Sequence, residues 1–427
     1  MRYLVLCTDY DGTLATDGRV FPETVAALQR LLASGRRAVL VTGRELDDLK
    51  KVCPRLDLFD YVVAENGALL YHPATGEETP LAPRPPEAFV ALLRQRGVGP
   101  ISVGRVIIAT WEPHETTVLA SIRDLGLELQ VIFNKGAVMI LPAGINKATG
   151  LAAALERMEL SPRNAVGVGD AENDHALLAS CELSAAVANA LPSLKSAADI
   201  VTRADHGAGV VELIDELLRD DLVSREPRLT RHHILLGSDE RGREVHVRPY
   251  GETVLVVGPT HRGRSELVAG LMERVALKGY TIGARRERLG HPHWVVVDET
   301  QHLVPANGVT EQGPLANGDG QSVLHIAERP ALVARQVLRA TTLFIALGTQ
   351  APAALDEFCQ VSGRERPAET GVTVEDGMAL AWRPADPNAQ PFRLNTAMPQ
   401  HPPSGGGGGV IKAAARQPAN TRTRGLH

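Results

Sequence analysis

Residues 3–14 read Tyr3-Leu4-Val5-Leu6-Cys7-Thr8-Asp9-Tyr10-Asp11-Gly12-Thr13-Leu14. The apolar run that opens this segment has no polar alternation, which predicts a strand buried on both faces, as in a parallel sheet. Asp9 and Asp11 then stand two residues apart, so in an extended backbone they point to the same side, and Gly12 allows a sharp turn. Carboxylates at the carboxyl end of a strand suit a divalent cation together with a nucleophile. An acidic turn that caps the next helix explains the same residues, so this segment alone leaves both interpretations open.

Three later segments extend the pattern. Residues 38–44 form a second apolar strand that ends at the hydroxyl of Thr42. Lys147 begins a helix, and residues 165–174 form a third strand that ends in another acidic cluster, with Asp170 and Asp174. Strands that alternate with helices in this way predict an α/β fold with a parallel sheet and right-handed crossovers.

In this order the motifs resemble those of the haloacid dehalogenase-like (HAD) phosphatases and, within them, the Cof-type sugar-phosphatase branch. The resemblance covers roughly the first half of the chain. It rests on Asp9-Tyr10-Asp11-Gly12-Thr13-Leu14, Thr42-Gly43-Arg44, Glu65-Asn66-Gly67-Ala68, Lys147 and Gly169-Asp170-x-x-Asn173-Asp174. It implies a Rossmann-like core. The αββαββ pattern over residues 73–143 looks like a compact Cof-type cap, which would exclude water and select the leaving group.

The resemblance also implies a role for each motif residue. Asp9 would be the nucleophile that forms an aspartyl-phosphate, and Asp11 would protonate the leaving alkoxide and then activate water. Thr42 and Lys147 would contact the phosphoryl group and complete the catalytic set. The predicted substrate-binding residues are Gly43, Arg44, Asn66 and Asn173.

Magnesium is the cofactor that the resemblance implies. Its ligands would be the side chains of Asp9 and Asp170 and the backbone carbonyl of Asp11. Asp174 would support the ion or bind it through water. Taken singly, several of these residues have plainer explanations. Thr42 can cap a helix, Lys147 can be a solvated lysine, and Asp174 can be a first-turn acid favoured by the helix dipole. Taken jointly and in family order, the motifs favour catalysis.

Composition narrows the class of protein. The net charge of −5 and the pI near 6.3 give no signature of a nucleic-acid or membrane partner. The four cysteines have no paired spacing, which indicates reduced thiols rather than a disulfide framework or a zinc site. No long apolar segment predicts a membrane span or a signal peptide. We therefore expect a cytoplasmic protein.

The length of 427 residues predicts more than one domain. We expect a HAD domain over residues 1–220, a charged linker that contains Pro227 over 221–229, and a second α/β domain over 230–398. The Pro- and Gly-rich composition over 399–427 predicts a disordered tail, and loop 305–320 is expected to be mobile.

The second half resembles P-loop ATPases of the DNA-translocation and conjugation type. An apolar strand at 253–257 leads into Gly258-Pro259-Thr260-His261-Arg262-Gly263-Arg264-Ser265, and a second strand ends in Asp298-Glu299. The nucleotide-binding residues that this implies are Gly258, Gly263, Arg264, Ser265, Asp298 and Glu299, with ATP or ADP as ligand. The loop lysine is replaced by Arg264, and residues 283–288 lack the expected acidic segment. A decayed nucleotide domain kept as a scaffold is the alternative.

The sequence thus predicts a magnesium-dependent phosphatase that acts on small phosphorylated metabolites, with sugar phosphates as the expected substrates. Two alternatives stay open. A phosphosugar mutase or phosphotransferase would pass the phosphoryl group from Asp9 to another acceptor. A nucleotide-responsive regulatory protein would use the HAD half on behalf of a partner.

Overall fold

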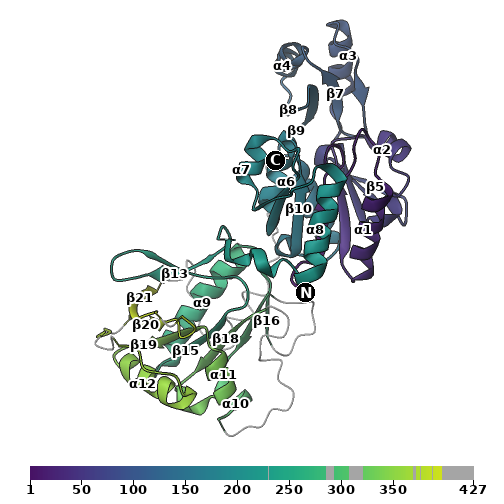
Figure 1. Cartoon of the computed structure of the whole chain (residues 1–427). Helices are drawn as coiled ribbons and strands as arrows, with labels where there is room; N and C mark the ends of the chain where they lie inside the picture. The colour runs from purple at the N-terminus through teal and green to yellow at the C-terminus, as the bar shows by residue number, and fades with distance from the viewer. Residues whose placement is uncertain are drawn as a thin grey trace. The chain divides into compact units, whose positions relative to one another are not determined.

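The structure is a computed structural model, and it describes residues 1–228, 230–284, 293–306, 321–368, 372–375, 377–386 and 388–396. The chain divides into two compact units, Met1–Leu229 and Thr230–His427 (Figure 1). The predicted disordered tail over 399–427 and most of the predicted mobile loop over 305–320 lie outside the described residues.

The core of the first unit is an eight-stranded sheet of order β12-β11-β10-β1-β2-β3-β4-β5. The strands from β12 to β3 pair in parallel, whereas β4 and β5 pair antiparallel at one edge. The strands are β1 (Val5–Thr8), β2 (Arg37–Val41), β3 (Tyr61–Ala64), β4 (Leu69–His72), β5 (Glu77–Pro80), β10 (Ala165–Gly169), β11 (Leu183–Ala186) and β12 (Ile200–Val201). Because β1 lies between β10 and β2, the segments that follow these three strands meet at one edge of the sheet.

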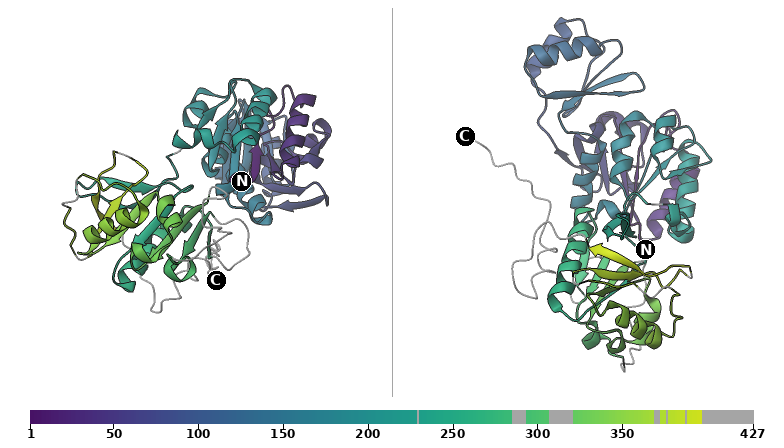
Figure 2. Two further views of the ribbon diagram at one scale, coloured as in Figure 1. Left: turned by 60° about the horizontal axis from the view of Figure 1, so that its bottom comes forward. Right: turned by 90° about the vertical axis from the view of Figure 1, so that its left-hand side faces the viewer.

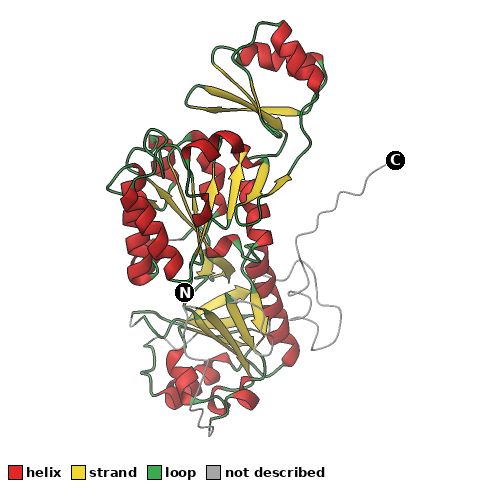
Figure 3. Cartoon of the chain, turned by 90° about the vertical axis from the view of Figure 1, so that its right-hand side faces the viewer, coloured by secondary structure: helices red, strands yellow, loops and turns green. Residues whose placement is uncertain are grey.

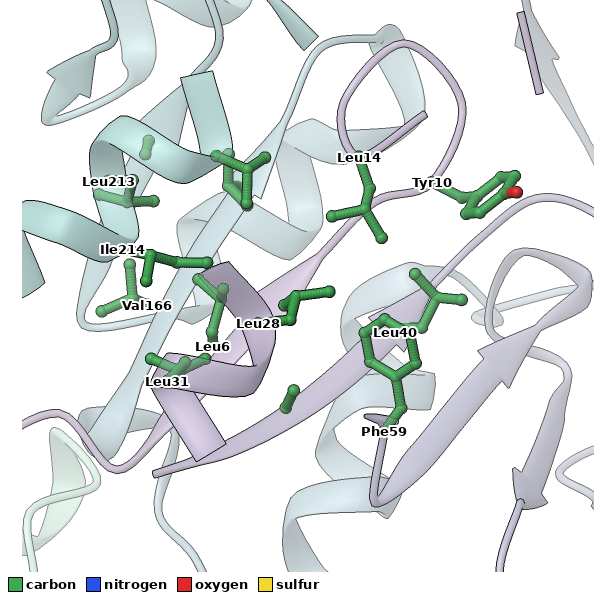
Figure 4. Packing of buried hydrophobic residues seen from close by; sticks show 14 of the residues in the cluster. Leu6, Tyr10, Leu14, Leu28, Leu31, Leu40, Phe59, Val166, Leu213 and Ile214 are labelled. Atoms are coloured by element: carbon green, nitrogen blue, oxygen red, sulfur yellow. The ribbon is translucent and has the colours of Figure 1, made fainter. Parts of the chain in front are cut away.

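Helices cover both faces of this sheet, as the apolar run in β1 predicted. Leu6 packs with α1, α2, α7 and α8 on one face, and its neighbours Val5 and Cys7 pack with α5 and α6 on the other. The helices are α1 (Pro22–Ala33), α2 (Leu46–Val52), α5 (Lys147–Arg157), α6 (His175–Ser180), α7 (Pro192–Ala197) and α8 (His206–Asp220). Figure 4 shows the first of these layers, in which Leu6 lies among Leu28, Leu31, Val166 and Ile214.

A separate four-stranded sheet of order β6-β7-β9-β8 forms the cap. The cap comprises α3 (Glu87–Gln95), β6 (Ser102–Val103), β7 (Ile108–Trp111), α4 (Glu115–Asp124), β8 (Leu129–Asn134) and β9 (Ala137–Pro142). Both helices pack on one face of the sheet through Phe89, Val118 and Ile140 (Figure 3). The αββαββ order is the one expected. The predicted start at residue 73 differs, because β5 (Glu77–Pro80) pairs with β4 and so belongs to the core sheet.

The second unit is built on a nine-stranded sheet of order β14-β13-β21-β20-β19-β15-β18-β17-β16, drawn in green to yellow in Figure 2. Val254 of β15 packs with α9 on one face, and Leu255 packs with α11 and α12 on the other. Its elements are β13 (Ile234–Ser238), β14 (Glu244–Val247), β15 (Thr253–Val257), α9 (His261–Leu277), β16 (Ile282–Ala284), β17 (Trp294–Val297), α10 (Thr300–Leu303), β18 (Ser322–Ala327), α11 (Arg335–Ala340), β19 (Leu343–Leu347), α12 (Ala351–Ser362), β20 (Ala379–Trp382) and β21 (Phe392–Thr396). The strands β16, β18 and β21 were not predicted from the sequence.

Two further observations bear on the sequence analysis. The four cysteines are all free and buried. Across the ranges that the structure describes, no helix has the length and apolar character that crossing a bilayer requires.

Candidate active site

The carboxyl edge of the core sheet brings together the predicted acidic residues. Asp9 follows β1 and Asp170 follows β10, its parallel neighbour. Together with Asp174 they offer carboxylate oxygens that all lie within 4.8 Å of one another. Each of these three residues is buried, with at most 4% of its surface exposed. Three carboxylates this close and this buried repel one another unless cations lie among them.

Lys147 supplies one such cation. Its ammonium donates hydrogen bonds to Asp9 Oδ1 at 2.5 Å and to Asp174 Oδ1 at 2.6 Å. The lysine is the first residue of α5, where Asn146 caps the helix and forms a capping box with Thr149. The backbone at Gly67, whose φ is +106°, packs closely against this helix start. Only glycine fits there, because a Cβ on Gly67 would lie 1.9 Å from Asn146 O. The buried ammonium is therefore held between the Asp9 and Asp174 carboxylates, and its helix begins at a capped, closely packed position.

Burial shapes the electrostatics of this cluster. Burial raises the pKa of Asp9 to about 7; the charge of Lys147 lowers it in part, and the Asp174 and Asp170 carboxylates raise it. Burial likewise raises the pKa of Asp170, against the lowering by Lys135. Burial disfavours the charge on Lys147, but the Asp174 and Asp9 carboxylates together raise its pKa above the ordinary value. Additional positive charge at Asp9 and Asp170 would stabilise their ionised forms.

The donor set fits a magnesium ion. Carboxylate and carbonyl oxygens are the ligands that this ion prefers, and Asp9, Asp170 and the backbone carbonyl of Asp11 converge here. The ammonium of Lys135 stands in for such a cation, because it donates to Asp170 Oδ2 at 2.9 Å and to Asp11 O at 3.1 Å. Gly12, with φ +84°, permits this approach, since a Cβ there would lie 2.3 Å from Asp170 Oδ2.

Asp174 has its oxygens committed to protein donors. Oδ1 accepts from Lys147, and Oδ2 accepts from the backbone N–H of Asp170 at 2.9 Å and of Ala171 at 3.0 Å. This arrangement holds the loop after β10 and orients Lys147. The geometry therefore favours a supporting role for Asp174, one of the roles predicted for it, over direct ligation of the cation.

Asp11 and Arg44 form a pair at the rim of the site. The Arg44 guanidinium binds both oxygens of Asp11, with distances of 2.7 and 2.8 Å, and also contacts Asp48. The Asp11 side chain is 36% exposed, in contrast to the buried Asp9. Gly43 and Arg44 line a cavity of about 600 Å³ together with Asp9, Asp11 and residues of the cap.

The remaining predicted residues lie just beneath this cavity. Thr42 is fully buried, and its hydroxyl accepts from Arg44 N at 3.1 Å. Asn173 donates to Asn66 Oδ1 at 2.9 Å. Asn66 Nδ2 and Asn173 Oδ1 are buried without a hydrogen-bond partner among the residues that the structure describes. Because Asn173 Nδ2 lies 3.5 Å from the position of a Cβ on Gly43, the amide pair adjoins the phosphoryl-binding loop expected after β2.

Sequence analysis missed two residues at this site. Lys135 and Gly136 form the turn between β8 and β9, and a lone lysine before a glycine between two strands predicts only that the lysine sits at a tight hairpin tip. Glu65, quoted solely as part of a motif, is 1% exposed and accepts from the backbone N–H groups of Arg105, Val106 and Ile107 at 2.7 to 2.9 Å. It ties the core to the turn between β6 and β7 of the cap, and no local pattern indicates that contact.

Known proteins are similar to this chain in sequence. A family model described as haloacid dehalogenase-like hydrolase matches residues 6–110 and 122–214. Phosphoglycolate phosphatase 2 from Saccharolobus solfataricus is 31% identical over 225 residues, which cover 92% of that protein and 50% of this chain. This chain belongs to the haloacid dehalogenase-like hydrolases. The resemblance that the sequence motifs predicted is thereby confirmed for the first half of this HAD hydrolase.

Two further comparisons each cover about half of this chain. A phosphoglycolate phosphatase from Methanothermobacter thermautotrophicus is 30% identical over 218 residues, or 96% of that protein and 49% of this chain. The crystal structure of a haloacid dehalogenase-like hydrolase from Bacteroides thetaiotaomicron has a TM-score of 0.45 and 19% identity, over 50% of this chain and 99% of that chain. The family match of the HAD hydrolase ends at residue 214, within the first unit.

The predicted nucleotide site in the second unit has a different geometry from the one expected. Helix α9 begins at His261, so Gly263, Arg264 and Ser265 lie inside the helix and not in a loop. Neither Gly258 nor Gly263 has a positive φ. The buried Arg264 guanidinium donates to Gly258 O, the carbonyl that follows β15. Arg264 thus bonds to its own chain at the point where a phosphate was expected.

The acidic pair Asp298-Glu299 follows β17, as predicted, but β18 lies between β17 and β15 in the sheet. The interval between Arg264 and Asp298 contains a further strand, β16 (Ile282–Ala284). Residues 285–288, where an acidic segment was expected and not found, lie outside the described part of the chain.

Proposed function

We propose that this protein hydrolyses phosphate monoesters of small metabolites, with Asp9 as the nucleophile. The observation that carries the proposal is the buried cluster of Asp9, Lys147 and Asp170, of which Asp9 lines the cavity of about 600 Å³. A buried carboxylate beside a fixed ammonium can attack phosphorus while positive charge stabilises the phosphoryl oxygens. Membership of the HAD hydrolases supports the same reaction.

In the first step, Asp9 would displace the alkoxide and become an aspartyl-phosphate. Asp11 lies two residues along the chain and lines the same cavity, so it is our candidate to protonate the leaving oxygen and later to activate water. Lys147 would hold Asp9 in place and neutralise charge as the phosphoryl group arrives. Its bond to Asp174 keeps the ammonium fixed throughout.

A magnesium ion at Asp9, Asp170 and the Asp11 carbonyl would supply positive charge to the phosphoryl oxygens. On the opposite side, the Thr42 hydroxyl accepts from Arg44 N and so retains its proton for a phosphoryl oxygen. The unpaired Nδ2 of Asn66 would likewise gain a phosphoryl oxygen as its acceptor. These contacts form the proposed phosphoryl pocket.

The substrate class follows from the cap and from the relatives. The cap lines one side of the cavity of about 600 Å³, a volume in the range of small-molecule sites. The sequence resemblance predicts sugar phosphates, while the relatives compared above are named phosphoglycolate phosphatases. We propose both as test substrates.

Release of inorganic phosphate from a panel of phosphate monoesters by the full-length chain tests this function. We expect turnover with Mg²⁺, none after chelation, and recovery when the ion is restored. Asp9→Asn should lower kcat at least roughly a thousandfold. Retained turnover in a folded Asp9→Asn variant would contradict the mechanism. Transfer of phosphate to an added alcohol in preference to water would favour the phosphotransferase alternative.

Nucleotide binding by the second unit stays a prediction. The geometry around Arg264 disfavours it, because the guanidinium already bonds to Gly258 O. If the loop can open, we expect weak binding of ATP or ADP with negligible hydrolysis. Calorimetric titration of the full-length chain with ATP and Mg²⁺ decides the matter, with Arg264→Ala as the matched variant. Absence of heat at millimolar nucleotide would mean that the unit is a scaffold.

A further inference from the structure

The tip of the β8–β9 hairpin reaches from the cap to the core. Asn134 pairs with Ala137, which leaves Lys135 and Gly136 as a two-residue turn. Their φ angles of +48° and +84° are those of a type I′ hairpin turn, whose twist matches the flanking strands. The turn geometry and strand register therefore fix the position of Lys135, while its four-carbon stem leaves the ammonium free to move.

The ammonium of Lys135 occupies two of the oxygens assigned to the cation. It donates to Asp170 Oδ2 at 2.9 Å and to Asp11 O at 3.1 Å. A dication at those oxygens repels an ammonium in contact with them. The half-exposed side chain, with 51% of its surface accessible, can swing away into the cavity that it lines.

The cavity offers few other cations to an anionic substrate. Among the described residues that line it, the positively charged ones are Arg44 and Lys135. Arg44 is already bound by the carboxylates of Asp11 and Asp48. The cap wall that surrounds the tip is largely apolar, with Ile101, Ile107, Ala109, Trp111, Ala137 and Met139. An ammonium displaced from Asp170 thus faces the leaving-group end of the substrate.

We propose that Lys135 is a specificity-determining residue, which binds a carboxylate carried by the leaving group when the cation site is filled. This inference rests on the proposed phosphatase function. It assigns to one cap residue the distinction between an anionic and a neutral leaving group of similar size. The phosphoryl group itself is held by the core, so Lys135 acts on the part of the substrate that varies.

Steady-state kinetics of the full-length chain with Mg²⁺ test this assignment. The substrates are 2-phosphoglycolate and 2-hydroxyethyl phosphate, which match in size and differ in the carboxylate. The readout is the ratio of their kcat/KM values. We expect the wild type to favour the carboxylate at least roughly tenfold, and Lys135→Met to bring the ratio close to one. Lys51→Met, which removes an exposed lysine outside the cavity, should keep the wild-type ratio.

Equilibrium binding separates this inference from the proposed function. In the Asp9→Asn background with Mg²⁺, calorimetry should show tighter binding of 2-phosphoglycolate than of 2-hydroxyethyl phosphate, and Lys135→Met should remove the difference. This arm decides the role of Lys135 even if the wild type turns over neither ester, whereas the phosphatase itself is tested by phosphate release from the full panel of monoesters. An unchanged ratio in Lys135→Met, or an equal loss on both esters, would overturn the inference, because the lysine would then act elsewhere or on the shared phosphoryl group.

Discussion

At the scale of single residues, the site holds buried carboxylates that repel one another when ionised. Asp9 and Asp170 are buried together, and their pKa values lie above the usual range chiefly because water is excluded. Lys147 offsets part of this repulsion but is shared with Asp174. A site arranged in this way gains stability from whatever cation or phosphoryl group completes it, and it is strained without them.

Asp9→Asn should therefore stabilise the metal-free protein. The folded state raises the pKa of Asp9 from 3.8 to about 7, so it binds that proton more tightly than the unfolded chain. Stability of the wild type must then fall as pH rises from about 4 to about 7 and stay low above it. At pH 8 in EDTA we expect the variant to be more stable by roughly 2–4 kcal/mol in urea unfolding.

The stability advantage of Asp9→Asn over the wild type should shrink toward pH 4 and disappear when Mg²⁺ is added. Asp11→Asn is the matched control, because Asp11 is partly exposed and paired with Arg44. It should show no comparable pH-dependent gain. A variant at Asp9 that is less stable than the wild type at pH 8 would show that Lys147 outweighs the burial of the carboxylate.

Lys135→Met should strengthen binding of the cation. The ammonium contacts Asp170 Oδ2 and Asp11 O and so competes for the same oxygens. Its removal should lower the Mg²⁺ concentration for half-maximal thermal stabilisation by roughly tenfold. Lys51→Met should leave the titration curve in place. A weaker response to Mg²⁺ in Lys135→Met would mean that the lysine supports the ion instead of competing with it.

At the scale of elements, the loop after β3 connects the catalytic edge to the cap. Its backbone bonds to the loop after β2, through Glu65 N to Arg44 O and Asn66 N to Thr42 O, both at 2.9 Å. The Glu65 carboxylate accepts from three successive backbone amides in the turn between β6 and β7 of the cap. Glu65 and Asn66 have positive φ angles of 52° and 54°, a conformation that these bonds hold in place.

Glu65→Gln should loosen this connection. An amide has a single acceptor oxygen, so at least one of the three buried N–H groups would lose its partner, at a cost of about 2 kcal/mol in global stability. Hydrogen exchange at residues 105–107 should quicken more than the average of the core. Glu77→Gln, at an exposed edge-strand position, should change stability by less than about 0.5 kcal/mol. Unchanged exchange at 105–107 would show that the cap is held by other contacts, such as the Arg105 pairs with Asp47 and Glu78.

At the scale of the whole molecule, each of the two units has hydrophobic clusters of its own. The first unit has its own clusters around β1 and the cap, and the second has clusters on both faces of β15. Each unit thus buries enough apolar surface to behave as an independent folding unit.

Thermal unfolding of the full-length chain should show two transitions. Mg²⁺ with inorganic phosphate should raise only the one that belongs to the first unit, because a ligand stabilises the unit that binds it, by about 2.7 kcal/mol at a hundredfold excess over its Kd. Asp170→Asn should abolish the shift and leave the other transition unmoved. A single transition that moves as a whole would show that the units unfold together.

The strand-end residues could be predicted from the sequence, because each depends on a local pattern. Apolar runs placed β1, β2 and β10 in a parallel sheet, and topology alone then brings Asp9, Thr42 and Asp170 to one edge. Lys147 could be found because it begins a helix in the expected order. The first half of the fold follows from the same alternation of strands and helices.

Only the tertiary structure determined the contacts that join residues of different elements. The contacts of Lys135 with Asp170 and of Glu65 with residues 105–107 depend on how the β8–β9 and β6–β7 turns of the cap lie on the core. In the second unit, an early start to α9 placed Arg264 within the helix and against Gly258 O, although the loop residues matched the motif. A local pattern specifies residue types along one segment, whereas these bonds join segments whose approach is set by long-range packing.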